Sequence, residues 1–285
     1  MKVLVTNHHL DQFRGSECFT YAIANELKQR GHSIDVFSFL GGKVQRLMNK
    51  FARPVEIIEA VRKRYDLALI NHNTCVDIVG DEYYKTVQTC HDIFTPLEQP
   101  KQGCQHYVAV SEEVETHLDK LGYQSTIIRN GIDTERFSIR RRTSKTLKRV
   151  LALTSNVESL RIIKDACRLK GVSFHAVDSE KTWDIEAVIN SNDLVFASGR
   201  GALQAASCGR NVIVLDKVLD GYLTHNNALD IRENNFSGRR YNLKCDADRL
   251  VDLMGLYTPE TGYRLRDYVL QNHNITKITK EYLNL

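Results

Sequence analysis

Short apolar runs alternate along the chain with segments in which apolar residues recur every three or four positions. Such runs predict buried strands, and the longer spacing predicts helices that cover them. In the first half the predicted strands are residues 3–5, 34–39, 67–70, 86–89, 107–110 and 126–128. In the second half they are residues 150–153, 172–177, 194–196 and 212–215.

Helix boundaries are marked by capping residues and glycines. Ser111 precedes Glu112 and Glu113, so we expect a helix to begin there and to end near Gly122. The predicted helices are residues 19–27, 112–121, 157–170, 185–190, 201–208, 247–256, 261–270 and 275–283.

The strand and helix alternation stops at a basic stretch and then restarts. The fold class we predict is therefore α/β, with two doubly wound Rossmann-like domains that face a cleft. The expected domains are 1–138 and 150–285, joined by a basic linker at 139–149, with the last helix packing back on the first domain. For the basic residues of this linker, a solvated surface, a contact with an anionic acceptor and binding to a membrane surface are all open.

Composition adds few constraints. Hydrophobic residues make up 42% and charged residues 26%, and the formal net charge is only +4, so a nucleic-acid partner is not indicated. The seven cysteines form no C-x-x-C pair, which favours a reducing compartment, and we expect a cytoplasmic protein. No run reaches the roughly 18 apolar residues of a transmembrane helix, so no transmembrane segment is predicted.

Two loops have the composition of phosphate-binding turns. Gly15 and Ser16 end the loop after the first strand, and Ser198, Gly199, Arg200 and Gly201 follow the strand at 194–196. Backbone N–H groups at a helix start can approach a phosphate, and an arginine beside them suits a diphosphate. Neither loop is the G-x-G-x-x-G dinucleotide fingerprint, and a capped helix start is the simpler interpretation of the first.

Longer strings resemble those of a known enzyme family. The segment VAVSE, followed by IIRNGIDTERF at 127–137, is similar to the end of the first domain in GT-B glycosyltransferases of the family-4 type. GSE at 15–17, QTCHDIF at 88–94, the 197–216 region and NFSGR at 235–239 also match the family. The resemblance implies a cleft lined by Asn130 and Asp133 and a histidine near the donor sugar, His91. It also implies transfer with retention of configuration.

The sequence departs from the family pattern in the predicted nucleotide site. Gln204 occupies the place of the glutamate that binds the ribose, and an amide loses the charge-assisted hydrogen bond. Thr154, Ser155 and Asn156 stand where the family has an arginine and a Lys-Gly segment, so they can offer a phosphate only neutral donors.

The sequence gives no indication of a metal or a cofactor. Asp246-Ala-Asp248 imitates a metal-binding D-x-D, but it opens a predicted helix, so we interpret it as a helix cap. His8 and His9 are potential ligands, but adjacent histidines without a partner cluster do not define a metal site.

Together these patterns predict a glycosyltransferase that uses a nucleotide-diphosphate sugar as donor substrate, without a metal. The acceptor is open between a glycan, a lipid-linked molecule, a protein and a nucleic acid, as is the oligomeric state. The alternatives are a sugar-nucleotide epimerase or hydrolase, a DNA-modifying glycosyltransferase and a non-catalytic nucleotide-sugar-binding protein.

Overall fold

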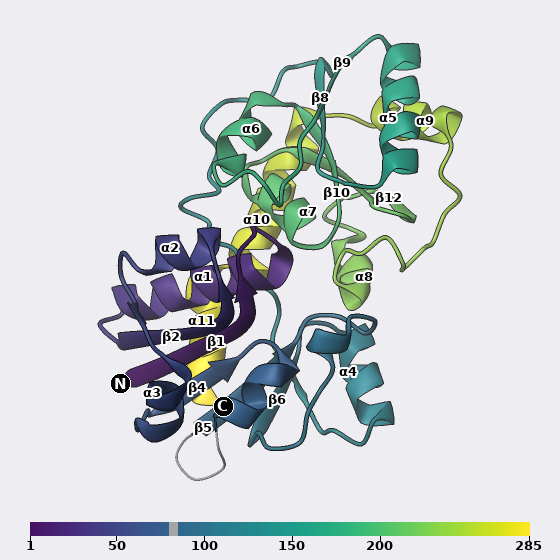
Figure 1. Ribbon diagram of the computed structural model, residues 1–285. Coiled ribbons are helices and arrows are strands. Elements are labelled where there is room, and N and C mark those ends of the chain that lie inside the picture. Colours follow the sequence, from purple (N-terminus) through teal and green to yellow (C-terminus); the bar gives the residue numbers. More distant parts are fainter. Residues whose placement is uncertain (80–84) are drawn as a thin grey trace. The chain divides into compact units, whose positions relative to one another are not determined.

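A computed structural model of the chain describes residues 1–79 and 85–285 (Figure 1). The described residues divide into two compact units. Unit 1 comprises Met1–Gly131 together with Ile275–Leu285, and unit 2 comprises Ile132–Asn274. The sequence places the end of the first domain later, at residue 138, and the structural division differs from it because 132–149 folds with unit 2.

Unit 1 is built on a parallel sheet. Its strands are β1 (Lys2–Leu10), β2 (Ser33–Gly41), β3 (Arg53–Pro54), β4 (Leu67–Ile70), β5 (Lys85–Cys90), β6 (His106–Ala109) and β7 (Thr126–Ile127). Its helices are α1 (Gly15–Gln29), α2 (Lys43–Met48), α3 (Ile57–Arg62), α4 (Glu112–Lys120) and α11 (Ile275–Asn284), with the 3-10 turns η1 (Asn73–Ile78) and η2 (Pro96–Glu98).

The strand order of this sheet is β3-β2-β1-β4-β5-β6-β7, so the order reverses direction between β1 and β4. Alternate residues of β1 serve the two faces. Val3 and Val5 join the apolar cluster under α1, α2 and α11, whereas Leu4 joins the cluster under α3 and η1. The C-terminal helix α11, yellow in Figure 1, packs against α1, and Ile275, Ile278 and Tyr282 contribute to that core.

Unit 2 is built on a smaller sheet. Its strands are β8 (Arg149–Ala152), β9 (Ser173–Ala176), β10 (Leu194–Ala197), β11 (Asn211–Leu215) and β12 (Leu219–Tyr222). Its helices are α5 (Val157–Lys170), α6 (Ile185–Ser191), α7 (Gly199–Ser207), α8 (Ala228–Ile231), α9 (Ala247–Gly255) and α10 (Pro259–Asn272), with the 3-10 turn η3 (Arg232–Asn234).

The strand order of the second sheet is β12-β11-β10-β8-β9. Alternate residues of β8 again pack on opposite faces of the sheet. Leu151 packs with α6, α7 and α10, and Val150 packs with α5 and α9. The sequence predicts parallel strands only, and β12 differs because it returns antiparallel to β11 after a short turn. A connection of three residues is too short for the crossover that a parallel strand needs.

Capping residues set the ends of the predicted helices. Asn156 accepts the N–H of Ser159 at 2.9 Å, and Gly171 ends α5 with a φ of 70°, so the predicted bounds of this helix are confirmed. Asp246 accepts the N–H of Arg249 at 3.0 Å and begins α9. The interpretation of the D-x-D sequence as a helix cap is confirmed.

The basic stretch 139–149 belongs to unit 2, and Arg140, Arg142, Lys145 and Lys148 within it are exposed. The carboxylate of Asp193, which is fully buried, lies 3.0 Å from the guanidinium of Arg141 and 3.5 Å from that of Arg149. It also accepts the N–H of Ser144 at 3.0 Å. A buried carboxylate needs such donors, so Asp193 fixes this stretch as part of unit 2.

Among the described residues, no helix combines the length and the apolar character that crossing a membrane requires.

Candidate functional site

The strand order of unit 2 reverses between β8 and β10, which are direct neighbours in the sheet. Ligands of doubly wound sheets bind at the carboxyl ends of strands where the order reverses. The loops that leave this point are 153–156 and the turn into α7, and Leu153 N–H donates to Phe196 O at 2.9 Å across them. The predicted donor-site residues 154–156 and 198–201 therefore lie at one edge of one sheet.

The first turn of α7 has a backbone shaped by Gly199. This residue has a φ of 50°, a conformation that L side chains rarely adopt. Its N–H donates to the carbonyl of Phe236 at 2.7 Å. The following N–H groups, of Arg200 and Gly201, belong to the first helical turn, which has no carbonyl partner within its own helix. The turn thus presents donors, and Arg200 adds a positive charge beside them.

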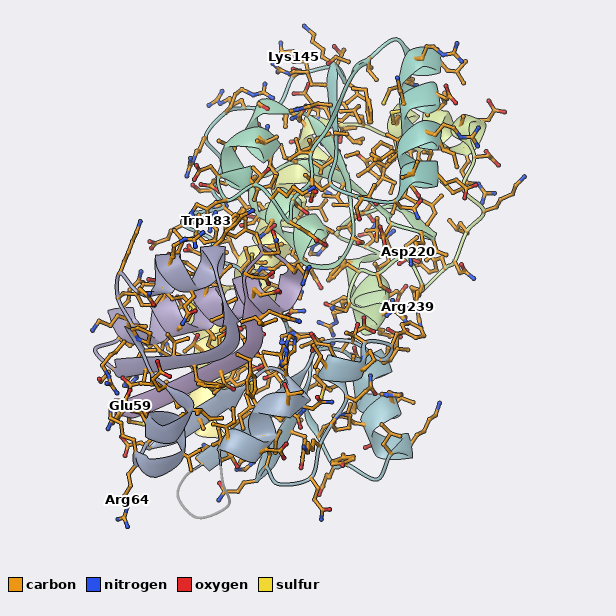
Figure 2. The ribbon with its side chains drawn as sticks, viewed as in Figure 1. Glu59, Arg64, Lys145, Trp183, Asp220 and Arg239 are labelled. Carbon is orange, nitrogen blue, oxygen red and sulfur yellow. The ribbon has the colours of Figure 1, made fainter. Side chains whose placement is uncertain are left out.

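The segment 235–239, which carries the NFSGR sequence, lies against this helix start. Asn235 and Phe236 both have positive φ values, 51° and 54°. Gly238 has a φ of 92°, and a Cβ added there would lie 2.2 Å from Val218 O, so a side chain does not fit. Asp220, labelled with Arg239 in Figure 2, accepts the N–H of Tyr241 at 2.7 Å and holds the turn.

Asp220 is almost fully buried, and its burial raises the pKa of the carboxyl despite hydrogen bonds from backbone N–H groups. The acidic group therefore has a structural role in shaping the turn that meets α7. The sequence indicates this segment only through the NFSGR string. It predicts neither the positive φ values nor the role of Asp220.

Thr154 and Asn156, which the sequence offers as neutral donors to a phosphate, make hydrogen bonds within the protein. The hydroxyl of Thr154 donates to Asp216 at 2.7 Å and accepts the N–H of Asn156 at 3.0 Å. The side chain of Asn156 caps α5. Ser155 is exposed at the start of α5. Thr154 and Asn156 therefore serve the helix start, and Ser155 is the exposed residue of this loop.

Gln204 lies on α7, one turn after Arg200, and is 9% exposed. Phe196, in the strand that leads to this helix, is fully buried on the opposite face of the sheet. This face of the sheet is packed by α5 and α9, so Phe196 belongs to the core and is no ligand-binding position.

Unit 1 has its own reversal of strand order, between β1 and β4. The polar side chains there form one connected network at the carboxyl ends of the strands. His72, directly after β4 and its flanking Asn71, accepts the N–H of His8 at Nδ1, at 3.3 Å. Its Nε2 lies 3.2 Å from Glu98 Oε1 and 3.3 Å from Ser16 Oγ. Since Nδ1 accepts, Nε2 carries the proton of the neutral ring and donates to Glu98.

His91 follows β5, and two contacts fix it. The amide N–H of Asn71 donates to the carbonyl of Thr6 at 3.0 Å, so Asn71 Oδ1 must face His91 Nε2, 3.2 Å away. An amide oxygen only accepts, so Nε2 of His91 is protonated and Nδ1 holds the lone pair of the neutral ring. Phe19 packs edge to face against the imidazole at a centroid distance of 4.9 Å.

Glu98 joins the two histidines. Its Oε2 accepts the backbone N–H of His91 at 3.1 Å, and its Oε1 accepts from His72. Burial alone would raise the pKa of this carboxyl. The interactions with His91 and His72 outweigh burial, so the pKa of Glu98 is lower than usual. Glu98 is therefore a buried anion that orients the ring of His72 and holds the backbone of His91.

Gly15 and Ser16 begin α1, as predicted from the loop, and Ser16 Oγ donates to Glu17 at 3.2 Å. Glu17 is 1% exposed, and burial raises the pKa of its carboxyl to about 7. The two predicted cleft residues belong to different units. Asn130 is buried in unit 1, and Asp133 in unit 2 accepts the N–H of Arg136 at 2.9 Å within a turn.

Sequence reasoning missed His72, Glu98 and Asn71. A signal for two of them existed, because Asn71 and His72 follow an apolar run and polar residues after a buried strand lie at the ligand-binding edge of a parallel sheet. Glu98 ends the short 3-10 turn η2, which no periodicity marks in the sequence, and only the fold brings it to the histidines.

No family model matches the chain, and no curated protein matches it in sequence. Solved structures do match it in fold. HepE from Anabaena, in complex with UDP and glucose, has a TM-score of 0.70 at 15% identity, covering 100% of this chain and 98% of its own.

A glycosyltransferase from Rickettsia africae has a TM-score of 0.66 at 12% identity, with 99% of this chain and 97% of that chain covered. A proposed UDP-N-acetylglucosamine 2-epimerase from Listeria monocytogenes has a TM-score of 0.65 at 11% identity, with 99% and 94% covered. The chain therefore has the two-unit, Rossmann-like GT-B fold of these proteins.

Proposed function

We propose that this protein is a glycosyltransferase that takes a sugar from a nucleotide-diphosphate donor, of the family-4 type. The observation that carries the proposal is the start of α7 in unit 2, where Gly199, the N–H groups of the first turn and Arg200 meet at the reversal point of the sheet. HepE, which has the same fold, was solved with UDP and glucose.

In this proposal the diphosphate binds at Ser198, Gly199, Arg200 and Gly201. When the glycosidic bond breaks, negative charge grows on the leaving diphosphate. Fixed N–H dipoles and a guanidinium stabilise that charge without reorganisation, which is the electrostatic mode of catalysis. Gln204, one turn further along α7, accepts and donates hydrogen bonds to the ribose hydroxyls, and Ser155 adds a neutral donor.

Unit 1 has the acceptor role in this proposal, with His91 as the residue that contacts the donor sugar. The network around it supports that role. Asn71 holds the ring in one tautomer through its contact with Nε2, and Glu98 holds the backbone N–H of the same residue. A pre-oriented group contributes to transfer without an entropic cost at the moment of reaction. Retention of configuration follows from the family resemblance.

The first experiment is a thermal-shift screen of the purified chain against uridine, guanosine, adenosine and thymidine diphosphates and their sugars. A ligand at 100 times its dissociation constant adds about 2.7 kcal/mol to the free energy of unfolding. We expect one base to raise the melting temperature and Arg200→Ala to remove most of that rise. Arg168→Ala is the matched control, because Arg168 is an exposed arginine in the last turn of α5.

The second candidate is a sugar-nucleotide epimerase or hydrolase, which the fold of the Listeria protein favours. The two functions differ in their need for an acceptor. Incubation of the preferred nucleotide sugar with the chain alone leaves it intact if the chain is a transferase, apart from slow hydrolysis. Rapid epimerisation or release of free sugar without an acceptor contradicts the first proposal and supports the second.

A further inference from the structure

Three potential metal ligands meet where β1 ends and α1 begins. His9, Asp11 and Glu17 each direct one donor atom into a cluster whose members lie within 4.8 Å of one another. Nδ1 of His9 is 3.9 Å from Oε1 of Glu17. The sequence predicts no metal here because two adjacent histidines lack partners, and the fold supplies two carboxylates beside the second histidine.

The donor atoms of this cluster are buried without hydrogen bonds. His9 Nδ1, Asp11 Oδ1 and Glu17 Oε1 have no hydrogen-bond partner within residues 1–79 and 85–285. Glu17 is the decisive case, since the residue is 1% exposed while its other oxygen accepts from Ser16. A buried carboxylate oxygen without a donor is costly, so its position calls for a ligand that the protein chain itself does not provide.

We infer that His9, Asp11 and Glu17 bind a divalent transition-metal ion, with Zn²⁺ as the best match. An imidazole nitrogen suits zinc, and carboxylate oxygens serve zinc as well, whereas Mg²⁺ and Ca²⁺ prefer oxygen ligands alone. In a tetrahedral zinc site neighbouring ligand atoms lie about 3.4 Å apart, as the bond lengths of about 2.1 Å require. The donor atoms lie up to 4.8 Å apart, so their side chains have to move closer together when an ion binds.

The backbone holds two of the ligands in place. The carbonyl of Asp11 accepts the N–H of Lys43 at 3.2 Å, and Gly42 lies so close that an added Cβ would be 2.5 Å from the Cα of Asp11. The backbone N–H of His9 donates to Asn7 Oδ1 at 3.3 Å. The backbone at both ligands is therefore fixed, which limits the movement their side chains need to reach an ion.

Arg14 is the group that opposes a cation. Its guanidinium lies 3.8 Å from Glu17 Oε1, but the side chain is 44% exposed, so it can turn into solvent when an ion binds. Removal of this charge by Arg14→Gln is expected to tighten metal binding several-fold.

Three protein ligands leave at least one position of a tetrahedral ion for an external oxygen atom, which is the pattern of sites that bind a water or a substrate. The His9 side chain is 23% exposed, so the cluster lies near the surface of the unit. The site belongs entirely to unit 1 and does not depend on the proposed transferase function.

The test is a calorimetric titration of the full, metal-free chain with Zn²⁺, with Mg²⁺ and Ca²⁺ in parallel. We expect one Zn²⁺ per chain and no comparable binding of the other two ions. Loss of even an outer-shell contact costs a metal site about 10- to 100-fold in affinity, so Glu17→Gln and His9→Gln should each weaken binding by about 100-fold or more. His8→Gln is the matched control, because His8 is the neighbouring histidine and its ring contacts Thr74.

The seven cysteines are the main competing ligands. Titration with Co²⁺ separates them, because a thiolate ligand gives a charge-transfer band in the near ultraviolet and a site of nitrogen and oxygen ligands does not. Far-ultraviolet circular dichroism shows whether each variant folds, and Asp11→Asn serves as the third ligand variant if one does not. Absence of Zn²⁺ binding, a thiolate band, or binding that survives both Glu17→Gln and His9→Gln overturns the inference.

Discussion

The carboxylate of Glu98 accepts the backbone N–H of His91 at 3.1 Å, from a loop seven residues further along the chain. Its other oxygen accepts the ring N–H of His72 at 3.2 Å. One buried anion thus fixes the backbone of the proposed sugar-contacting histidine and the ring of a neighbouring one. The proposal for unit 1 depends on this arrangement, and it can be tested at Glu98 without a change to His91.

Glu98→Gln is expected to lower the rate of transfer and to leave nucleotide binding unchanged. An amide nitrogen cannot accept an N–H, so one of the two hydrogen bonds is lost, at a cost of about 1.5–3 kcal/mol for a bond to a charged group. If half of that cost falls on the position of His91, kcat drops about 3- to 12-fold, since about 1.4 kcal/mol is a factor of ten.

The readout is kcat and KM together with the dissociation constant of the nucleotide diphosphate. Asp119→Asn, at an exposed carboxylate of α4, is the control. An unchanged kcat in Glu98→Gln would remove the positioning role of Glu98.

Asp193→Ala should destabilise unit 2 strongly. The substitution leaves Arg141 and the N–H of Ser144 without their buried acceptor, and each lost hydrogen bond to a charged group costs about 1.5–3 kcal/mol. Asp165→Ala removes a partner of Arg168 at the surface, where an ion pair contributes about 0–1 kcal/mol. Urea denaturation of both variants measures the difference, and equal free energies of unfolding would mean that stretch 139–149 is not anchored by Asp193.

The ionisation of Asp35 makes the free energy of unfolding of unit 1 depend on pH. Burial opposes its charge, but hydrogen bonds from Arg53, Lys63 and Tyr65 outweigh this and lower the pKa from 3.8 to about 2. Because the folded state binds this proton less tightly than the unfolded state, the stabilisation is present above about pH 4 and disappears as the pH falls towards 2. The shift corresponds to about 2 kcal/mol.

We expect Asp35→Asn to lose this part of the acid dependence in urea denaturation between pH 4 and 2. Asp77→Asn, at a surface carboxylate paired with Lys101, keeps the wild-type slope. A wild-type slope in Asp35→Asn as well would show that Asp35 is not the group that titrates.

The sequence predicts the regular elements well and the sites less well, for a physical reason. Local patterns decide a strand or a helix, so β4 and α5 have the predicted bounds, and Asp246 caps α9. The direction of β12 depends on the length of a turn. The network around Glu98 depends on contacts between distant loops, which no local pattern records.

The same reason explains the basic stretch at 139–149. Six basic residues without an acid indicate a solvated segment, but two of them, Arg141 and Arg149, pair with Asp193, which is 44 residues away from Arg149 in sequence. The positions 198–201 were correctly expected at a helix start after a strand. Their role in binding a nucleotide stays a prediction.

The most direct test of the central claim is a calorimetric titration of the preferred nucleotide diphosphate into Gly199→Ala and Gly171→Ala. Both glycines have positive φ values, 50° and 70°, and a Cβ at either meets nothing closer than 3.8 Å, so both substitutions impose a similar backbone strain of about 1–2 kcal/mol. Only Gly199 lies at the start of α7. We predict a dissociation constant raised about 10-fold or more in Gly199→Ala and unchanged in Gly171→Ala. Equal affinities in the two variants and the wild type would contradict a diphosphate site at this turn.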